Sequence, residues 1–402
     1  MRFQRQPRWW ILIAVSAVLG SGVTLPGQAS AGPNVGNRAA AVLLGDSYAA
    51  GEGGRWEGNG PTAVDRGIFQ TYGGTWDYPA IPPGNAEGCH RSDVAVIYPY
   101  ETFEALDLTR SKANIACGGA ETKHVLTDGF KGAKPQLEQL KERLKQNPGI
   151  KYVVLSIGGN DAGVSGVAQD CIKKFVMKQS AGSKQVSAAE GAKYQDYVKG
   201  LKESDKNLVC AASPTLSGLE GKLENVYETI FKEAISPLAP DAQLVVLNYP
   251  NPLPAGDAEL RRPFELNLVS RLQDGGCPFF DKDFAKFAGI SKDVNGTIKN
   301  AVEAAAKNNV PVHLLDVAGM YQGHEVCASA TTQDKEWFRQ VPADLLSDPR
   351  LIHEALHPNA YGQRMEGRCV SNFLDELSSR TAKSASEHGV CQDNADVRVD
   401  MV

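Results

Sequence analysis

The chain has 402 residues, of which 42% are hydrophobic and 22% charged, and this balance excludes a wholly disordered protein. Its 47 acidic residues outnumber its 42 lysines and arginines, which gives a net charge of −5. Such an acidic chain is a poor candidate for binding nucleic acid, whose phosphates attract basic surfaces. The length suits one large α/β domain with insertions or two modest domains.

The N-terminus has the three parts of an export signal. Three arginines lie within the first eight residues, a mostly apolar and uncharged run covers 9–19, and 29–31 read Ala-Ser-Ala, a small-x-small cleavage site. The apolar run is short for a bilayer span, and no later stretch approaches about 18 uninterrupted apolar residues. We expect residues 1–31 to be a signal peptide cleaved near Ala31, and the mature protein to be secreted without a stable membrane span. A retained membrane anchor is the alternative.

After a linker rich in Gly, Pro and Asn at 32–38, apolar runs and amphipathic segments alternate. Four short apolar runs end abruptly at polar or turn residues, which is typical of strands buried on both faces. These runs lie at 38–44, 151–157, 243–248 and 310–317. Helical periodicity is found at 135–145, 219–235, 284–308 and 359–378. The alternation predicts a parallel sheet with helices on both faces, and ligands bind at the carboxyl ends of such strands.

Two regions fit neither pattern. Residues 51–88 are rich in Gly, Pro and aromatic residues, and residues 163–212 are polar and carry two cysteines. We interpret both as excursions over the active face of a single domain at 39–380. Residues 381–402 are expected to form a polar C-terminal tail.

The eight cysteines agree with export, because an even number in an exported chain indicates disulfides. Eight cysteines permit roughly a hundred pairings, so the sequence alone does not determine the pairing. Since local loops are the simplest to close, we expect sequential disulfides, the last of which ties down the C-terminal tail: Cys89–Cys117, Cys171–Cys210, Cys277–Cys327 and Cys369–Cys391. The chain has no C-x-x-C pair, which argues against a structural zinc site.

Four short blocks of the sequence resemble those of the GDSL, or SGNH, hydrolase family. Gly-Asp-Ser-Tyr at 45–48 is similar to the family's first block, and Ala-Cys-Gly-Gly-Ala at 116–120 to its glycine block. Gly-Gly-Asn-Asp at 158–161 resembles its Gly-Asn-Asp block, and His-Pro-Asn at 357–359 its histidine block. The blocks occur in the family's order. The resemblance implies a flavodoxin-like α/β fold, a three-layer αβα sandwich with a central parallel sheet and loop insertions.

The resemblance also implies a serine-dependent hydrolysis of carboxylic esters, for which no cofactor is required. A serine hydroxyl is a weak nucleophile until an adjacent base takes its proton. The resemblance assigns these two roles to Ser47 and His357. The oxyanion of the tetrahedral intermediate needs donors that are already in place. The resemblance assigns that role to the backbone N–H groups of Ser47 and Gly119 and to the side-chain amide of Asn160.

One position departs from the family pattern. The family usually has an aspartate three residues before the histidine, and this chain has Glu354 there. A carboxylate one methylene longer can still reach Nδ1 of the imidazole, and some members use a backbone carbonyl instead. The group that orients His357 therefore stays open between Glu354 and a carbonyl.

The same segment also matches a zinc-protease motif. Residues 353–357 read His-Glu-Ala-Leu-His, in which His353 and His357 would be ligands one helical turn apart and Glu354 the base. Pro358 argues against this reading, because a proline directly after the second histidine breaks the helix. A Gly-x-Ser-x-Gly elbow is absent around Ser47, which argues against the α/β-hydrolase fold.

The sequence therefore predicts a secreted esterase or lipase, without a metal or cofactor. We expect a monomer that acts on a small-molecule or lipid acyl ester. The aromatic residues within 51–88 favour a lipid. The alternatives are a carbohydrate O-acyl (acetyl) esterase, the zinc metalloprotease, and a non-catalytic surface binding module of the same fold.

Overall fold

The computed structural model describes most of the chain beyond residue 39. The described residues are 40–59, 64–65, 88–92, 94–96, 114–177, 209–256, 259–260, 271, 275–341, 353–380, 386–392 and 396–401. They all belong to one of the two units into which the chain divides, Asn37–Val402. The predicted signal peptide and linker, and much of both excursions, lie outside the described residues. Within these residues, no helix is both long and apolar enough to cross a bilayer.

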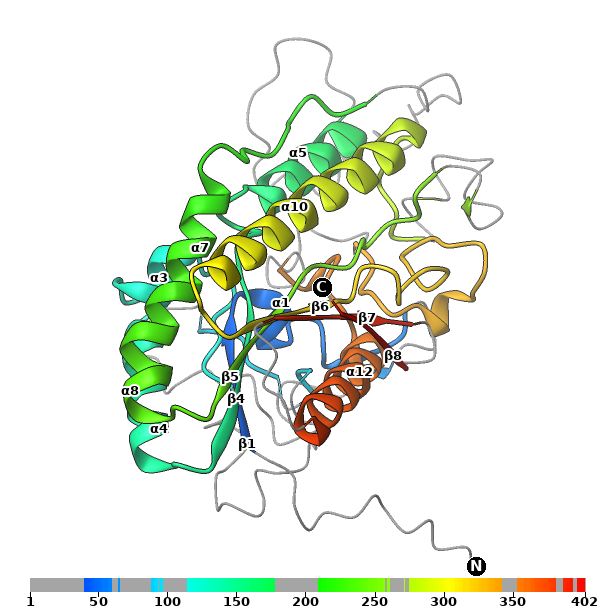
Figure 1. The fold of residues 1–402 in the computed structure, drawn as a ribbon. Helices are drawn as coiled ribbons and strands as arrows, with labels where there is room; N and C mark the ends of the chain where they lie inside the picture. The colour runs from blue at the N-terminus through cyan, green and yellow to red at the C-terminus, as the bar shows by residue number, and fades with distance from the viewer. Residues whose placement is uncertain are drawn as a thin grey trace, which may run out of the picture. The chain divides into compact units, whose positions relative to one another are not determined.

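A sheet with the strand order β1-β4-β5-β6-β7-β8 forms the centre of the described part (Figure 1). The first five of these strands are parallel, and β8 is antiparallel to β7. Their bounds are Ala40–Gly45, Ile150–Ser156, Gln243–Leu247, Val312–Asp316, Glu387–Cys391 and Val397–Met401. A separate antiparallel pair consists of β2 (Trp56–Glu57) and β3 (Val64–Asp65).

A short segment extends the sheet beyond β1. Asn114 forms an isolated parallel bridge with Leu43, and Cys117 N donates to Gly45 O at 3.0 Å. This segment precedes β4 in the chain but lies on the other side of β1. The order of segment, β1, β4, β5 and β6 is therefore the flavodoxin-like 2-1-3-4-5 order.

Helices cover both faces of the sheet, as Figure 1 shows for α7 and α10 on one side and α12 on the other. On the α12 side, the Tyr152 hydroxyl of β4 donates to Leu374 O at 3.0 Å. The longer helices are α4 (Gln136–Gln146), α5 (Val164–Met177), α7 (Leu219–Ile230), α10 (Asp281–Lys307) and α12 (Ala360–Ser379). The shorter ones are α1 (Ser47–Ala50), α3 (Thr122–Leu126), the π-helix η5 (Phe231–Ile235), α8 (Ser236–Leu238) and the 3₁₀ turn η7 (Gln333–Lys335).

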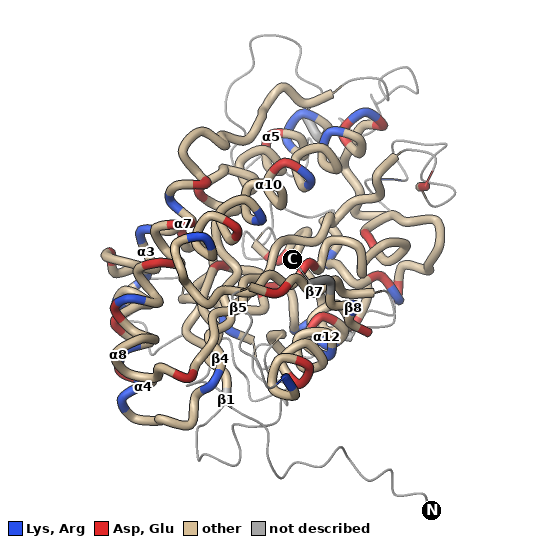
Figure 2. Tube along the Cα trace, in the orientation of Figure 1, with Lys and Arg blue, Asp and Glu red and all other residues tan. Residues whose placement is uncertain are grey.

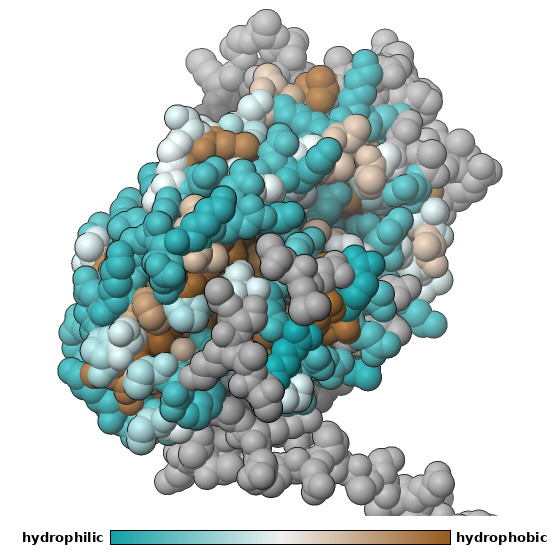
Figure 3. All heavy atoms as spheres, in the orientation of Figure 1, coloured by the Kyte–Doolittle hydropathy of each residue, from teal (hydrophilic) through white to brown (hydrophobic). Residues whose placement is uncertain are grey.

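These elements form where the hydrophobic pattern predicts them. The four predicted strands correspond to β1, β4, β5 and β6, which are buried along nearly their whole length because helices cover the sheet. The four predicted helices correspond to α4, α7 with η5, α10 and α12. Figure 2 shows both signs of charge interspersed along α7 and α10, and Figure 3 shows a mainly hydrophilic surface over them. The α/β fold with a central parallel sheet is confirmed.

Two regions differ from the expectation. The excursion at 163–212 begins with helix α5, whose Val167, Cys171 and Phe175 are buried, so its first part is an amphipathic helix. The described parts of the expected C-terminal tail at 381–402 include two strands, β7 and β8, which continue the central sheet beyond β6. On β7, Glu387, Gly389 and Cys391 are buried while the residues between them are partly exposed, as expected for a strand with one covered face.

Four disulfides join the sequentially paired cysteines: Cys89–Cys117, Cys171–Cys210, Cys277–Cys327 and Cys369–Cys391. The first attaches the segment before His90 to the glycine block. The second attaches α5 to residue 210, whose N–H donates to Asp283 Oδ1 of α10 at 2.9 Å. The last joins α12 to β7.

Candidate active site

The four sequence blocks meet at the carboxyl ends of β1, β4 and the edge segment, as expected for a parallel α/β sheet. Ser47 begins helix α1 directly after β1, and Asp46 caps this helix by accepting from Tyr48 N at 3.1 Å. Asn160 follows β4, and Gly119 follows the edge segment. His357 enters from the loop before α12.

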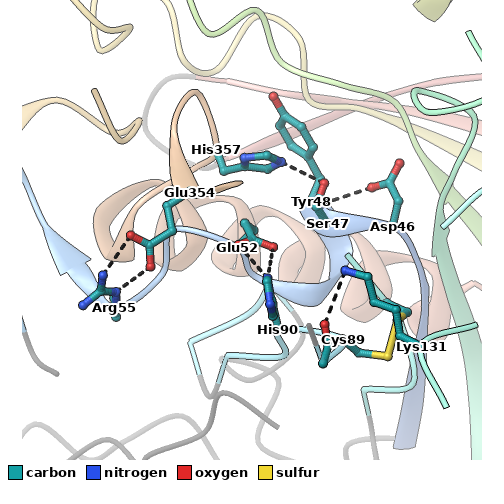
Figure 4. Close-up of polar contacts among 12 residues, drawn as sticks. Asp46, Ser47, Tyr48, Glu52, Arg55, Cys89, His90, Lys131, Glu354 and His357 are labelled. Carbon is teal, nitrogen blue, oxygen red and sulfur yellow. Dashed lines mark hydrogen bonds and ion pairs between the residues drawn. A yellow bond between two sulfur atoms is a disulfide. The ribbon is translucent and has the colours of Figure 1, made fainter. Parts of the chain in front are cut away.

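His357 is in hydrogen-bond contact with Ser47, as Figure 4 shows. Nε2 lies 2.8 Å from Ser47 Oγ, and Nδ1 lies 3.1 Å from Ala355 O. Since a carbonyl oxygen only accepts, Nδ1 is assigned the proton and Nε2 is left to accept from the serine hydroxyl. Burial lowers the pKa of His357, opposed in part by the nearby Glu52 carboxylate. A lowered pKa favours the neutral imidazole, which is the form that can act as a base.

Contacts from two other segments hold the loop that carries His357. Leu356 has a φ of +62°, which is uncommon for a residue with a side chain. Its N–H donates to Arg339 O at 2.8 Å, and its carbonyl accepts from the Tyr48 hydroxyl at 2.9 Å. Arg339 N in turn donates to His357 O at 2.8 Å. Tyr48, the residue after Ser47, therefore also holds the loop that carries His357.

Glu354, one of the two groups that the sequence left open as the orienting partner of His357, does not contact the imidazole Nδ1. Its carboxylate accepts from Arg55 Nη2 at 3.0 Å and from Trp56 Nε1 at 2.7 Å, and in Figure 4 it points away from the imidazole. The physical reason is that Arg55 supplies a full positive charge to a carboxylate that is otherwise buried. Of the two groups left open by the sequence, the backbone carbonyl of Ala355 is the partner of Nδ1.

The backbone of this segment also disagrees with the zinc-protease motif. Helical structure ends after Glu354, and the left-handed φ of Leu356 separates the two histidines. A single helix therefore does not present His353 and His357 one turn apart. Among the described residues, the cluster with suitable donor spacing is Cys171, Cys210 and Asp283, and its two sulfurs already form a disulfide.

The three residues expected at the oxyanion hole line one pocket with His357. Gly119 has a φ of +86° and is exposed, so a glycine suits this conformation and leaves its backbone open to a ligand. Asn160 Nδ2 donates to Ala120 O at 2.9 Å, which joins the Gly-Asn-Asp block to the glycine block. An amide nitrogen carries two hydrogens, and the second is the donor that the expected role requires.

Tyr249 is a residue of this site that the sequence analysis missed. Its hydroxyl donates to Asp46 Oδ2 at 2.6 Å and accepts from Gly159 N at 3.1 Å. Burial raises the pKa of Asp46 to about 7, and the bond from Tyr249 opposes that rise. The side-chain amide of Asn295 bonds both backbone groups of Tyr249, at 3.0 and 2.7 Å. Its position in the sequence could have indicated it, because Tyr249 follows the carboxyl end of a predicted strand, where ligands bind in such sheets.

The pocket has a volume of about 460 Å³, and its lining has two parts. We call the part supplied by α5 and α10 the apolar arm: Val164, Ala168, Ile172, Phe287, Ile290 and Val294. We call the other part the polar arm: Glu52, His90, Glu121, Lys131 and His353. His124, the other histidine near the glycine block, instead stacks on Phe130 with 4.0 Å between ring centroids.

Comparisons with known proteins give the same family as the four sequence blocks. Residues 43–365 match the model of the GDSL-like Lipase/Acylhydrolase family. A lipase of Streptomyces rimosus is 25% identical over 85% of this chain and 86% of its own length. Lipase 1 of Streptomyces coelicolor is 27% identical over 87% of this chain and 91% of its own length.

Among solved structures, the chain is similar to an extracellular lipase from Streptomyces rimosus, with a TM-score of 0.44 and 22% identity over 85% of this chain and 100% of that one. The family match covers most of the described unit, including the segments that carry Ser47, Gly119, Asn160 and His357. The chain belongs to the GDSL-like lipase/acylhydrolase family and is an ester hydrolase.

Proposed function

We propose that this protein is a secreted esterase or lipase that hydrolyses esters of apolar acyl chains through an acyl-enzyme on Ser47. The observation that carries the proposal is the 2.8 Å contact between His357 Nε2 and Ser47 Oγ, with Nδ1 held by Ala355 O. A nucleophile bonded to a base that is itself oriented by a third group is the arrangement that activates a serine.

The proposed reaction has two halves. Ser47 Oγ attacks the carbonyl carbon of the ester while its proton passes to His357 Nε2. The oxyanion accepts hydrogen bonds from the N–H groups of Ser47 and Gly119 and from the Asn160 amide, and loss of one such donor typically costs about 2.7–4 kcal/mol of barrier. The intermediate then expels the alcohol, which takes the proton from His357. Water releases the acid by the same steps, with His357 again as base.

The lining of the pocket supports the substrate class. Six apolar side chains of the apolar arm suit an acyl chain, because each buried CH₂ group contributes about 0.8 kcal/mol to binding. The polar arm suits the alcohol part of the ester. The two curated relatives named above are lipases, which also favours a lipid substrate.

A second candidate is a carbohydrate O-acyl esterase. The observation that favours it is the polar arm, where Glu52, His90 and Lys131 are polar side chains that suit a polyol. In this case the apolar arm would take little part in binding, and acetate esters would be the preferred substrates.

Export is part of the proposal. The four disulfides support it, because structural disulfides are typical of proteins that leave the reducing cytosol. The arginine-rich start and the Ala-Ser-Ala site at 29–31 indicate where the signal would be removed.

One set of assays tests the function. Hydrolysis rates of p-nitrophenyl esters with acyl chains from acetyl to palmitoyl are measured beside acetylated sugars, for the wild type and Ser47→Ala. The lipid proposal predicts that kcat/KM rises from acetyl to medium or long chains and that Ser47→Ala is inactive. A preference for acetylated sugars supports the second candidate. Absence of turnover on all of them indicates a binding module.

A further inference from the structure

A carboxylate outside the four family blocks lies close to the Ser47–His357 pair (Figure 4). Glu52 follows helix α1 by two residues, is 2% exposed and lines the same pocket as His357. A Cβ added to Gly118 would lie 2.9 Å from Glu52 Oε2 and 3.8 Å from Ser47 Cβ. The absence of a side chain at Gly118 therefore makes room for this carboxylate next to the nucleophile.

His90 holds Glu52 in its ionised form. Both Glu52 oxygens lie 2.9 Å from His90 Nδ1. Burial raises the pKa of Glu52, but the His90 bond and the charges of His90, His357 and His353 outweigh burial and hold that pKa below its ordinary value. His90 has a φ of +55° and follows Cys89 of the disulfide to the glycine block. A non-glycine residue keeps such a conformation only where its surroundings hold it there.

His357 has no carboxylate at Nδ1. The partner of Nδ1 is the neutral Ala355 carbonyl, and Glu354 is occupied by Arg55 and Trp56. When His357 takes the serine proton, an imidazolium forms in a buried site, where an uncompensated charge is costly. In Ser-His-Asp triads the aspartate stabilises that imidazolium. In this chain, a carboxylate that stabilises the His357 imidazolium must lie elsewhere than at Nδ1.

Glu52 is the acid of the pocket that is placed to supply it. The titratable groups of the lining, besides His357 and the tyrosines, are Asp46, Glu52, His90, Glu121, Lys131 and His353. Asp46 is bonded by Tyr249, and Glu121 is paired with Lys123 at 3.0 Å. Burial lowers the pKa of His357, and Glu52 opposes this more strongly than either His353 or His90 reinforces it.

We propose that Glu52, held by His90, is a positioning residue whose carboxylate is the counter-charge of the His357 imidazolium. This inference rests on the proposed function. The proton moves from Ser47 Oγ to His357 Nε2 and then to the oxygen of the leaving alcohol, and Glu52 neither gains nor loses one. Glu52 thus takes over the electrostatic task of the triad aspartate, and Ala355 O takes over the orienting task.

The test is the pH dependence of kcat/KM for Glu52→Gln on a p-nitrophenyl ester. Loss of the negative charge lowers the pKa of His357, so the ascending limb moves to lower pH by about one pH unit. The plateau of kcat/KM falls about tenfold, because the imidazolium is less stabilised in the transition state. Glu52→Asp keeps the charge and is expected to restore most of the plateau and the position of the limb.

Matched variants separate this role from a structural one. Glu366→Gln removes another buried carboxylate, which accepts from Tyr321 outside the pocket lining, and is expected to leave the limb in place. Should Glu52→Gln fail to fold, the double variant Glu52→Gln/His90→Gln replaces the pair by two neutral side chains that still hydrogen-bond. It is expected to move the limb in the same direction but by less, because His90, which it also removes, lowers the pKa of His357.

The outcomes are distinct. The counter-charge role of Glu52 is supported if the ascending limb of the kcat/KM pH profile moves to lower pH in Glu52→Gln or the double variant and returns to its wild-type position in Glu52→Asp. A folded variant with reduced activity but an unmoved limb overturns it and leaves Glu52 a structural residue. Ser47→Ala is assayed beside them, because retained activity there refutes the proposed function itself rather than the role of Glu52.

Discussion

The Tyr249 hydroxyl donates a 2.6 Å hydrogen bond to the Asp46 carboxylate, across 203 residues of sequence. The same hydroxyl accepts a hydrogen bond from Gly159 N. Tyr249, which follows β5, therefore joins Asp46, the residue before the proposed nucleophile, to the Gly-Asn-Asp block at 158–161. Asn295 of α10 holds Tyr249 by both backbone groups. The positions of Ser47 and Asn160 relative to each other therefore depend on this tyrosine.

Tyr249→Phe tests that dependence. Removing the hydroxyl leaves a buried carboxylate and a backbone N–H without this partner, which costs about 1–3 kcal/mol of unfolding free energy. We expect kcat to fall about tenfold with little change in KM, because the donors shift relative to the oxyanion. Tyr227→Phe is the matched control, since the buried Tyr227 hydroxyl has no hydrogen-bond partner among the described residues. Equal behaviour of the two variants would contradict the role of Tyr249.

The contacts of Glu354 with Arg55 and Trp56 give a second prediction. Glu354→Gln weakens the contacts that anchor the histidine loop to Arg55 and Trp56, so the unfolding free energy falls by about 1–3 kcal/mol. The imidazole keeps its Ala355 partner, so kcat falls less than about tenfold, whereas Ser47→Ala loses at least about a thousandfold. Chemical denaturation and steady-state kinetics measure the two effects. Equal losses of activity would make Glu354 a full member of a triad.

Much of this site was predictable from the sequence, and the exceptions have physical reasons. Ser47, Gly119, Asn160 and His357 lie in four short blocks that resemble those of the family, so the resemblance was enough to select them, and two of these blocks follow predicted strands. The choice between Glu354 and a carbonyl stayed open, because the partner Arg55 lies in a distant segment and sequence spacing does not report which neighbour a side chain faces.

The sequence did not predict helix α5 or strands β7 and β8, because contacts with distant segments decide these elements too. Helix α5 lies in a region whose overall composition is polar, although one of its faces is apolar and lines the pocket. Strand β7 contains Glu387 and Gly389, which lower its β propensity, and it forms because β6 offers an edge to pair with, while β8 pairs with β7. Pairing between distant segments decided these cases.

The buried His313 of β6 predicts acid sensitivity where β6 pairs with β7. Burial, reinforced by Arg380, lowers the pKa of His313 to about 4, and its Nδ1 accepts from Glu387 N at 3.2 Å. In the unfolded chain His313 is protonated below about pH 6.5, whereas in the folded protein it is protonated only below about pH 4. Folding stability is therefore complete above pH 6.5 and falls by up to roughly 3 kcal/mol as the pH drops to 4.

Urea denaturation of the wild type and His313→Gln between pH 8 and 4, with disulfides intact, measures this effect. A glutamine keeps an acceptor for Glu387 N and does not titrate, so the variant should lose less unfolding free energy over that range. Parallel curves for the two proteins would contradict the assignment.

The apolar arm gives a prediction for specificity. Ala168→Trp places a large side chain from α5 into the space that faces α10. We expect kcat/KM for decanoyl esters to fall by at least about tenfold, because several CH₂ groups lose their burial, while acetyl esters change little. Lys173→Trp, at an exposed position of the same helix, is the control. An equal loss on both esters would indicate damage to the site rather than a blocked acyl subsite.

The most direct measurement is mass spectrometry of the protein after reaction with a p-nitrophenyl organophosphonate. We expect one adduct per chain, on the peptide that contains Ser47, with labelling slowed by at least about a hundredfold in His357→Gln because the base is lost. An adduct on another residue, or a Ser47→Ala protein that still labels and still hydrolyses esters, would contradict this expectation.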